Sequence, residues 1–308
     1  MTGDTSSREV LLVVHTGRAE ALALAERMAK RLTDAGVDVL ALATEAEDMA
    51  PAGMTSISDA QAAQRRPEIV VVLGGDGTIL RGAELARAAG APVLGVNLGR
   101  VGFLAEAERD DIDDVADRVL ARSYQVEERM TLDVELTLDG RQMGSAWALN
   151  DVSIEKAARA LMVDIAVEVD GRPLSVWGCD GVIAATPTGS TAYSFSAGGP
   201  VVWPEVEALL LTPLAAHALF NRPLVAAPTS TLALELLRGH APATGPAAVL
   251  SADGRRSIDL PAGTRVEVRR GAVPVRLARL HVAPFTDRLV AKLRLPVQGW
   301  RGPDSRGR

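Results

Sequence analysis

A glycine-rich loop around one carboxylate is the strongest chemical signal in the sequence. The apolar run Ile69–Leu73 leads directly into Gly74-Gly75-Asp76-Gly77-Thr78. Because the three glycines have no Cβ atoms, the backbone there can approach a phosphate closely and point its N–H groups at the oxygens. The threonine is expected to begin a helix, whose N-terminus also favours an anion. The loop therefore predicts a phosphate site at the carboxyl end of a strand, where open α/β sheets usually bind ligands.

Asp76 needs a separate explanation, because a carboxylate beside phosphates is unfavourable unless it binds a metal ion or receives a proton. Both roles suit phosphoryl transfer, in which an acceptor holds the attacking hydroxyl and a cation offsets the developing charge. The alternative is a glycine-rich turn with an incidental aspartate, which the preceding strand and the following helix disfavour. The loop has neither the Gly-Lys-Ser/Thr ending of a P-loop nor the spacing of a dinucleotide fingerprint.

Two further segments place polar groups after apolar strands. Residues Asp180–Pro200 begin with a short apolar strand and continue into hydroxyls, small residues, a tyrosine and a glycine pair. Such a segment can offer backbone donors, hydroxyls and a ring to a nucleotide, although a surface loop can share the composition. The pair Asn150-Asp151 follows the apolar run Trp147–Leu149. It can bind ribose hydroxyls or an adenine edge, but a turn is the commoner explanation for such a pair alone.

Composition and charge exclude several classes of function. The net charge of −6 gives no general attraction to nucleic acid or to an anionic membrane, and the 3% aromatic content leaves few rings for stacking bases. A single cysteine, Cys179, excludes an intrachain disulfide and a thiolate metal cage. No apolar run approaches the roughly 20 residues of a membrane span. We therefore expect a cytoplasmic protein with no nucleic-acid or membrane partner.

Signatures of metallo-sites and acyl transfer are missing from the sequence. The four histidines have no metal-ligand spacing and are interpreted as structural or surface residues: His15, His217, His240 and His281. The run Gly189-Ser190 is followed by Thr191-Ala192, so the nucleophile elbow Gly-x-Ser-x-Gly is not formed. Hydrolysis by a serine nucleophile is therefore disfavoured.

The first 123 of the 308 residues alternate short apolar runs with helix-type stretches, which predicts βαβ units on a parallel sheet. We expect a Rossmann-like α/β domain over residues 1–123. The expected strands are Val10–Val14, Val37–Leu42, Ile69–Leu73 and Val93–Val96, and the expected helices are Arg18–Ala35, Thr78–Ala89 and Asp110–Arg122.

After Tyr124 the pattern changes to short alternating runs separated by turn dipeptides, which predicts an antiparallel, β-sandwich-like domain over residues 124–283. Asp139-Gly140 and Asp170-Gly171 are expected to be hairpin turns. The expected strands are Leu132–Leu138, Gln142–Leu149, Leu161–Val169, Thr231–Leu237 and Arg265–Arg269. Residues 284–308 form a separate C-terminal segment that we expect to pack back on the first domain.

Together, the three polar segments resemble the NAD kinase family. The resemblance extends to Asn97–Leu104, Ala216–Leu224 and Asp253-Gly254, and it runs from about residue 70 to the end of the chain. The glycine–aspartate loop alone is weakly specific, since diacylglycerol, sphingosine and phosphofructokinases are similar there. The segment Asp180–Pro200 is far more specific. The ending Arg288–Gly302 is most similar to actinobacterial members.

The resemblance implies phosphorylation of the 2′-hydroxyl of the adenosine ribose of NAD, giving NADP. The implied donor is ATP, another triphosphate or polyphosphate, assisted by a divalent cation such as Mg²⁺, and the implied assembly is a homodimer or homotetramer. Asp76 would accept the hydroxyl proton, Gly77 would lie against the dinucleotide, and Arg81 would face phosphate. Asn150 and Asp151 would hold NAD. The same resemblance assigns further NAD contacts to Asp180, Thr191, Ala192, Tyr193, Ser194, Phe195 and Ser196.

Two positions depart from the family pattern. Asp151 stands where many relatives have Glu, so the charge is kept but the side chain reaches less far. Gly178 stands where some relatives have Arg, which removes a potential phosphate contact that Lys156 or Arg159 would have to supply. Two alternatives stay open: a lipid or other small-molecule kinase with the same glycine–aspartate loop, and a non-catalytic NAD(P)-binding regulator that would not need Asp76.

Overall fold

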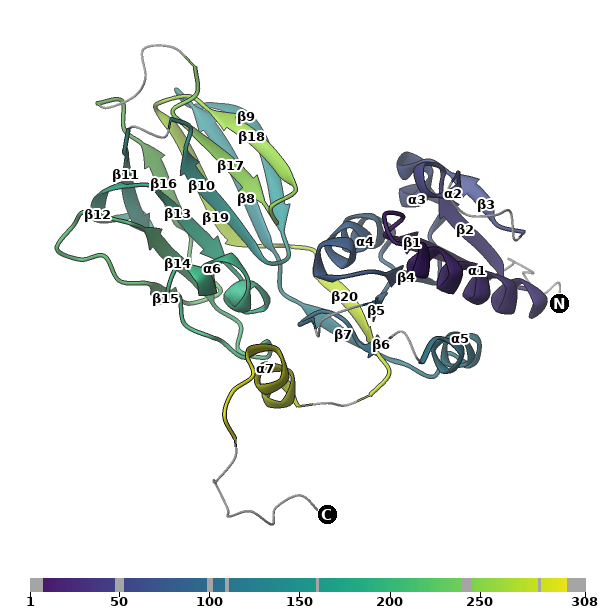
Figure 1. Ribbon diagram of the computed structural model, residues 1–308. Coiled ribbons are helices and arrows are strands. Elements are labelled where there is room, and N and C mark those ends of the chain that lie inside the picture. Colours follow the sequence, from purple (N-terminus) through teal and green to yellow (C-terminus); the bar gives the residue numbers. More distant parts are fainter. Residues whose placement is uncertain are drawn as a thin grey trace. The chain divides into compact units, whose positions relative to one another are not determined.

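The computed structural model describes residues 8–47, 53–98, 102–108, 111–158, 161–239, 245–281 and 284–297. The chain divides into two compact units, each with its own sheet structure (Figure 1). Each unit also has its own apolar core. The first unit comprises the described residues of Met1–Glu128 and Val275–Arg308, and the second comprises those of Arg129–Pro274.

In the described part of the first unit, eight strands form one sheet in the order β3-β2-β1-β4-β5-β20-β7, with β6 beside β5. The pairs that join β1 through β5 are parallel. The strands β4 and β5 are buried along their whole length, as expected for central strands of a sheet covered on both faces. The strand bounds are β1 Glu9–Val14, β2 Asp38–Leu42, β3 Thr55–Ile57, β4 Ile69–Leu73, β5 Val93–Asn97, β6 Ala107–Glu108, β7 Gln125–Arg129 and β20 Val275–Arg279.

Helix α4 packs closely on the sheet because two glycines leave room for it. A Cβ on Gly82 of the helix would lie 2.4 Å from Cγ2 of Val72, and one on Gly95 of β5 would lie 2.5 Å from Cδ1 of Ile79. The helices are α1 Ala19–Asp34, α2 Ala43–Ala46, α3 Asp59–Arg65, α4 Asp76–Ala89, α5 Ile112–Ala121 and α7 Phe285–Leu293. None of these described helices has both the length and the apolar composition of a membrane span.

The described part of the second unit is a sandwich of two antiparallel, six-stranded sheets. Their orders are β15-β14-β13-β10-β17-β18 and β12-β11-β16-β19-β8-β9. Apolar side chains from both sheets form one core, with Trp177 fully buried in it. The bounds are β8 Leu132–Leu138, β9 Arg141–Ala148, β10 Asp151–Lys156, β11 Val163–Val169, β12 Arg172–Cys179, β13 Gly181–Ala185, β14 Leu209–Leu214, β15 Leu224–Ala226, β16 Leu232–Leu236, β17 Ala248–Ala252, β18 Arg256–Leu260 and β19 Thr264–Arg270.

Three hairpins of the second unit turn at an Asp-Gly pair in which both residues have positive φ. The φ values are 50° and 75° at Asp139-Gly140, 52° and 73° at Asp170-Gly171, and 53° and 64° at Asp253-Gly254. This conformation is that of a type I′ turn, whose twist matches that of the flanking strands. The two turns expected from the sequence are therefore confirmed.

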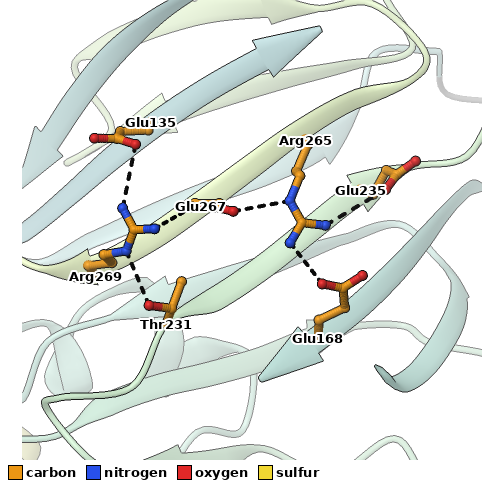
Figure 2. A network of polar contacts seen from close by, with 7 residues as sticks. All are labelled: Glu135, Glu168, Thr231, Glu235, Arg265, Glu267 and Arg269. Atoms are coloured by element: carbon orange, nitrogen blue, oxygen red, sulfur yellow. Dashed lines mark hydrogen bonds and ion pairs between the residues drawn. The ribbon is translucent and has the colours of Figure 1, made fainter. Parts of the chain in front are cut away.

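The outward face of the second six-stranded sheet carries a row of ion pairs (Figure 2). On β19, Glu267 lies between Arg265 and Arg269, with contacts of 3.1 Å and 2.5 Å. The two arginines also contact residues of the neighbouring strands and loops: Glu168, Glu235, Glu135 and Thr231. The alternate residues of β19 are buried, so this strand separates charge on one face from the core on the other.

The boundaries of the two units differ from those expected from the sequence. The residues of β7 and β20 fall within the β-rich domain expected over residues 124–283, although no strand was expected at either place, and both strands belong to the sheet of the first unit. Leu277 of β20 pairs in parallel with Val93 of β5, and Ala278 joins the first unit's core. Periodicity identifies a strand but not its partner, which depends on contacts between residues distant in the sequence.

Candidate active-site residues

Asp76 is the first residue of α4, which Gly75 caps. The backbone N–H groups of Phe103 and Leu104 donate to its two carboxylate oxygens, each at 3.3 Å. The side chain is 33% exposed. Gly102 makes the approach possible, because a Cβ there would lie 2.4 Å from Oδ1 of Asp76. The carboxylate is therefore oriented by two amides while part of it stays open to solvent.

The glycines of the loop have two different roles. A Cβ on Gly74 would lie 2.5 Å from Oγ1 of Thr78, so this glycine is required for the tight turn. At Gly75 and Gly77, a Cβ would meet no described atom within 4 Å. The first amides of an α-helix have no intrahelical acceptor, so this open part of the loop can present N–H groups to a phosphate. The helix begins at Asp76, two residues before its expected start at Thr78.

Lys292, for which no role was expected from the sequence, lies near Asp76. Its Nζ is 4.0 Å from Oδ2 of Asp76 and 5.9 Å from the ring centroid of Phe103. The lysine is on α7, in the C-terminal segment. The available signal was its spacing from Phe285 and Arg288, which places the three side chains on one face of a helix.

Arg81 does not extend toward the glycine loop. Its guanidinium pairs with Glu45 at 2.7 Å and contacts Oγ1 of Thr44. Glu45 is only 2% exposed, and it accepts the N–H of Val14 at 2.8 Å. Burial raises the pKa of Glu45, while the Val14 N–H and Arg81 oppose this shift. The phosphate contact expected of Arg81 remains a prediction.

In the second unit, Asp253 fixes the backbone around the Asn150-Asp151 pair. Its carboxylate accepts the N–H groups of Leu149 at 3.0 Å, Asn150 at 2.7 Å and Asp151 at 3.4 Å. It also pairs with Arg256 at 2.9 Å. A turn such as Asp253-Gly254 is common in β proteins, so the local sequence does not indicate that its carboxylate accepts hydrogen bonds from residues about 100 positions earlier in the chain.

Asp151 lies at the start of β10 and is 5% exposed. Its Oδ2 accepts the N–H of Tyr193 at 3.3 Å. Burial, followed by the negative charge of Asp253, raises the pKa of Asp151 to about 7, although the Tyr193 N–H opposes the shift. Near neutral pH this carboxyl group can therefore either donate a hydrogen bond to a ribose oxygen or accept one from a ribose hydroxyl.

The segment after β13 packs on the Asn150 backbone. Thr186 donates its hydroxyl to the carbonyl of Leu149 at 2.6 Å and accepts the N–H of Gly189 at 3.1 Å. A Cβ on Gly189 would lie 1.9 Å from the carbonyl oxygen of Asn150. Such close contact requires a glycine, so the small residues in this segment hold two strand ends together.

The predicted NAD contacts of this segment fall into exposed and buried groups. Tyr193 and Phe195 are exposed, and the Tyr193 hydroxyl donates to Glu155 at 3.2 Å. Ser194 is fully buried and shares a hydrogen bond of 3.0 Å with Thr212. In this structure the hydroxyl of Ser194 is therefore a buried structural hydrogen-bonding group. The remaining members, Thr191, Ala192 and Ser196, lie in or beside the short helices Thr188–Thr191 and Tyr193–Ser196.

Asp180 pairs with Lys156, whose Nζ lies 2.6 Å from its Oδ1. Lys156 was one of two candidates for a phosphate contact, and in this structure its charge is directed to Asp180. The other candidate, Arg159, lies outside the described residues, as do Gly99, Arg100 and Val101 of the Asn97–Leu104 motif. The described residues contain no group of three or more His, Cys, Asp or Glu side chains placed to hold a metal ion.

Comparison with known proteins matches nearly the whole chain to one family. The ATP-NAD kinase N-terminal domain matches residues 10–124, and the ATP-NAD kinase C-terminal domain matches residues 149–280. The NAD kinase 2 of Streptomyces coelicolor is 58% identical, over 96% of this chain and 97% of its own length. The NAD kinase of Thermobifida fusca is 55% identical, over 98% and 94% respectively.

Two solved structures have a similar fold. Yeast NADH kinase complexed with NADH superposes with a TM-score of 0.84 at 22% identity, over 94% of this chain and 88% of that chain. An NAD kinase from Archaeoglobus fulgidus in complex with ATP gives a TM-score of 0.68 at 25% identity, over 94% and 98%. The expected fold, an α/β domain followed by an antiparallel β-sandwich, is confirmed. From the domain matches and the sequence identities, the chain belongs to the NAD kinase family.

Proposed function

We propose that this chain transfers the γ-phosphoryl group of ATP to the 2′-hydroxyl of the adenosine ribose of NAD, with Asp76 as proton acceptor. Family membership supports a kinase that acts on NAD, and it does not favour a lipid kinase or a non-catalytic regulator. The observation that carries the role of Asp76 is its setting: a carboxylate at a helix start, beside a glycine loop, oriented by the N–H groups of Phe103 and Leu104.

The chemistry follows from that setting. The ribose oxygen forms a bond to the γ-phosphorus while the bond from this phosphorus to the bridging oxygen breaks, and ADP leaves with the electron pair. The hydroxyl proton passes to Asp76. The two amide donors fix the direction of the carboxylate before the substrate arrives, and such preorganisation lowers the barrier because no reorientation is needed during the reaction. The open backbone at Gly75 and Gly77 would contact the phosphates.

We assign dinucleotide binding to residues of the second unit. Asn150 and Asp151 would hydrogen-bond the ribose, because Asp253 fixes their backbone and burial leaves Asp151 with a pKa of about 7. Tyr193 and Phe195 would offer exposed rings to a base. The hydroxyl of Thr191, the backbone of Ala192, Ser194 and Ser196, and the carboxylate of Asp180 complete the proposed set.

A divalent cation fits these residues only if it arrives with the nucleotide. The described residues offer the loop no cage of three ligands, whereas Mg²⁺ commonly uses one or two protein oxygens together with substrate phosphates. The hydroxyl of Thr78 would supply such a protein oxygen, and the cation would offset charge on the phosphates. We expect a chelator in excess to abolish NADP formation by the purified protein and added Mg²⁺ to restore it; full turnover in chelator would exclude this role.

The role of Asp76 is tested by Asp76→Asn, which keeps the size of the side chain and removes its ability to accept a proton. We expect NAD affinity to stay within about tenfold, roughly 1.4 kcal/mol, because binding contacts are retained. NADP formation should fall by at least about a hundredfold. Calorimetry with NAD and an assay of NADP with Mg²⁺ and ATP measure the two quantities.

A matched control is Asp34→Asn, which alters an exposed aspartate that pairs with Lys30 at the end of α1. This variant should keep full turnover. Undiminished NADP formation by Asp76→Asn would remove Asp76 from the mechanism. Wild-type protein that binds NAD but forms no NADP with any triphosphate or polyphosphate would point to a regulator, and activity on an apolar alcohol would point to a lipid kinase.

We further infer a homodimer or homotetramer, since the resemblance to the family implies one, and a cytoplasmic location, since a single cysteine fits a reducing compartment. Size-exclusion chromatography with light scattering tests the assembly, and a monomer at micromolar concentration would exclude it. The donor assay with ATP, other triphosphates and polyphosphate also establishes which phosphoryl donor the chain prefers.

A further inference from the structure

The C-terminal helix α7 places a cation beside the proposed proton acceptor. Phe285, Arg288 and Lys292 are spaced so that their side chains share one face of this helix. The ring of Phe285 lies 6.1 Å from the ring of Phe103, between centroids. Lys292 lies 4.0 Å from Asp76, as described above. One helix face therefore contacts the same short segment that orients the Asp76 carboxylate.

Arg288 anchors this face. Its guanidinium donates to the carbonyl of Ala105 at 2.9 Å and pairs with Glu106 at 2.5 Å. Glu106 is only 1% exposed, and it also binds Arg279 at 3.0 Å and the N–H of His281 at 3.0 Å. A buried carboxylate with three donors resists displacement, because losing any donor leaves the charge undersolvated. The anchor fixes α7, and with it the position from which Lys292 extends.

The geometry of Lys292 differs from that of the lysines that serve as ordinary ion-pair partners. Lys30 lies 2.8 Å from Asp34, and Lys156 lies 2.6 Å from Asp180, which are charge-assisted hydrogen bonds. The 4.0 Å between Lys292 and Asp76 is too long for a hydrogen bond. The ammonium is held near the carboxylate without donating to it, and the side chain is 34% exposed, so its donors remain accessible to an anion.

We propose that Lys292 binds a non-bridging oxygen of the phosphoryl group while that group passes to the hydroxyl held by Asp76. The inference rests on the proposed function, since it takes Asp76 as the proton acceptor. The bonds that form and break are those of the transfer step given above, and Lys292 contributes only hydrogen-bond donors to it. Lysine suits this task as a compact point charge for phosphate. The ammonium would offset charge on the equatorial oxygens while the carboxylate takes the proton.

The test compares three substitutions. Lys292→Met keeps an unbranched stem against Phe103 but removes the charge, Lys292→Arg keeps the charge, and Lys30→Met is the matched control on an exposed lysine of the same unit. We expect kcat of Lys292→Met to fall about a hundredfold, as for loss of one donor to a developing anion. Its KM for NAD should stay within about threefold, and Lys292→Arg should recover most of the loss. Lys30→Met should match the wild type.

A binding measurement separates phosphate contact from a structural role. In an Asp76→Asn background, which cannot complete the reaction, adding Lys292→Met should weaken binding of the β,γ-imido analogue of ATP about tenfold, with NAD affinity and melting temperature unchanged. Wild-type turnover by Lys292→Met, together with an inactive Asp76→Asn, would overturn this inference alone. Undiminished turnover by Asp76→Asn would overturn the proposed function. If Lys292→Met lowered the melting temperature and Lys292→Arg did not restore kcat, the role of Lys292 would be structural and the inference would be wrong.

Discussion

Asp76 and Asp151 both follow apolar runs in the sequence, yet the fold gives the two carboxylates different environments. Asp76 is partly exposed and accepts two backbone N–H groups. Asp151 is buried, accepts one N–H group, and lies close to another carboxylate, that of Asp253. The environment of Asp76 suits a group that contacts a reacting hydroxyl. The environment of Asp151 suits a group that can either donate or accept a hydrogen bond near neutral pH. The difference comes from neighbours distant in the sequence.

The raised pKa of Asp151 has a consequence for stability. Its pKa is about 7 in the folded protein against a reference value of 3.8, so the folded state holds a proton that the unfolded state releases. Stability should therefore fall as pH rises from about 4 to about 7, and the full penalty should apply above that window. Asp151→Asn removes the charge and keeps an acceptor for the Tyr193 N–H. At pH 8 we expect the free energy of unfolding of this variant to exceed that of the wild type by the order of a few kcal/mol. At pH 4.5 the two free energies should differ little.

Tryptophan fluorescence during denaturation suits this measurement, because Trp147, Trp177 and Trp203, three of the four tryptophans, lie in the second unit. Asp34→Asn provides the exposed control, for which no such pH-dependent gain is expected. Parallel stability curves for wild type and Asp151→Asn across pH 4.5 to 8 would contradict a strongly raised pKa.

At the scale of elements, strands with a clear hydrophobic pattern were predictable from the sequence. A very short strand, and a strand whose partner is distant in the sequence, were not. Ile69–Leu73 and Leu132–Leu138 match β4 and β8 residue for residue, because the first is a continuous buried run and the second alternates. The strand β3, of three residues, is too short to carry a pattern. The sheet to which β20 belongs was also missed, since its pairing with β5 joins segments at opposite ends of the chain.

The candidate site shows the same limit. The glycine loop and Asp76 could be identified from the sequence because their chemistry is contiguous. The role of Lys292 could not, because it depends on contact with Asp76 across the fold. Gly102 was noted only as part of the Asn97–Leu104 resemblance, and its contact with Asp76 became evident in the structure. Asp253 was noted only through the family resemblance, and its hydrogen bonds to the Leu149–Asp151 backbone became evident in the structure. Local sequence thus predicts groups that react, whereas the residues that position them require the fold.

At the scale of the whole molecule, the first unit is discontinuous and the second is one continuous segment. The strand β20 lies between β5 and β7 in the first unit's sheet, although it follows the entire second unit in the chain. Val275 and Leu277 of β20 are buried, as is Leu280, which directly follows the strand. Burying each of these side chains contributes about 1.5–3 kcal/mol, so together they approach the roughly 5–15 kcal/mol by which a typical domain is stable. The first unit therefore depends on residues that are synthesised after the entire second unit.

We expect a chain that ends at Pro274 to lose the first unit and keep the second. The helices α1, α4 and α5 belong to the first unit, so the helical circular dichroism signal at 222 nm should fall sharply. The second unit retains all its described strands, and its cooperative thermal transition in tryptophan fluorescence should persist.

A chain that ends at His281 is the matched control, since it keeps β20 but lacks α7 and should keep the helical signal. Because Lys292 and Arg288 are also absent from that control, it should fold yet form NADP slowly. Retention of the full helical signal by the chain ending at Pro274 would show that β20 is dispensable, and loss of the fluorescence transition would show that the second unit does not fold by itself.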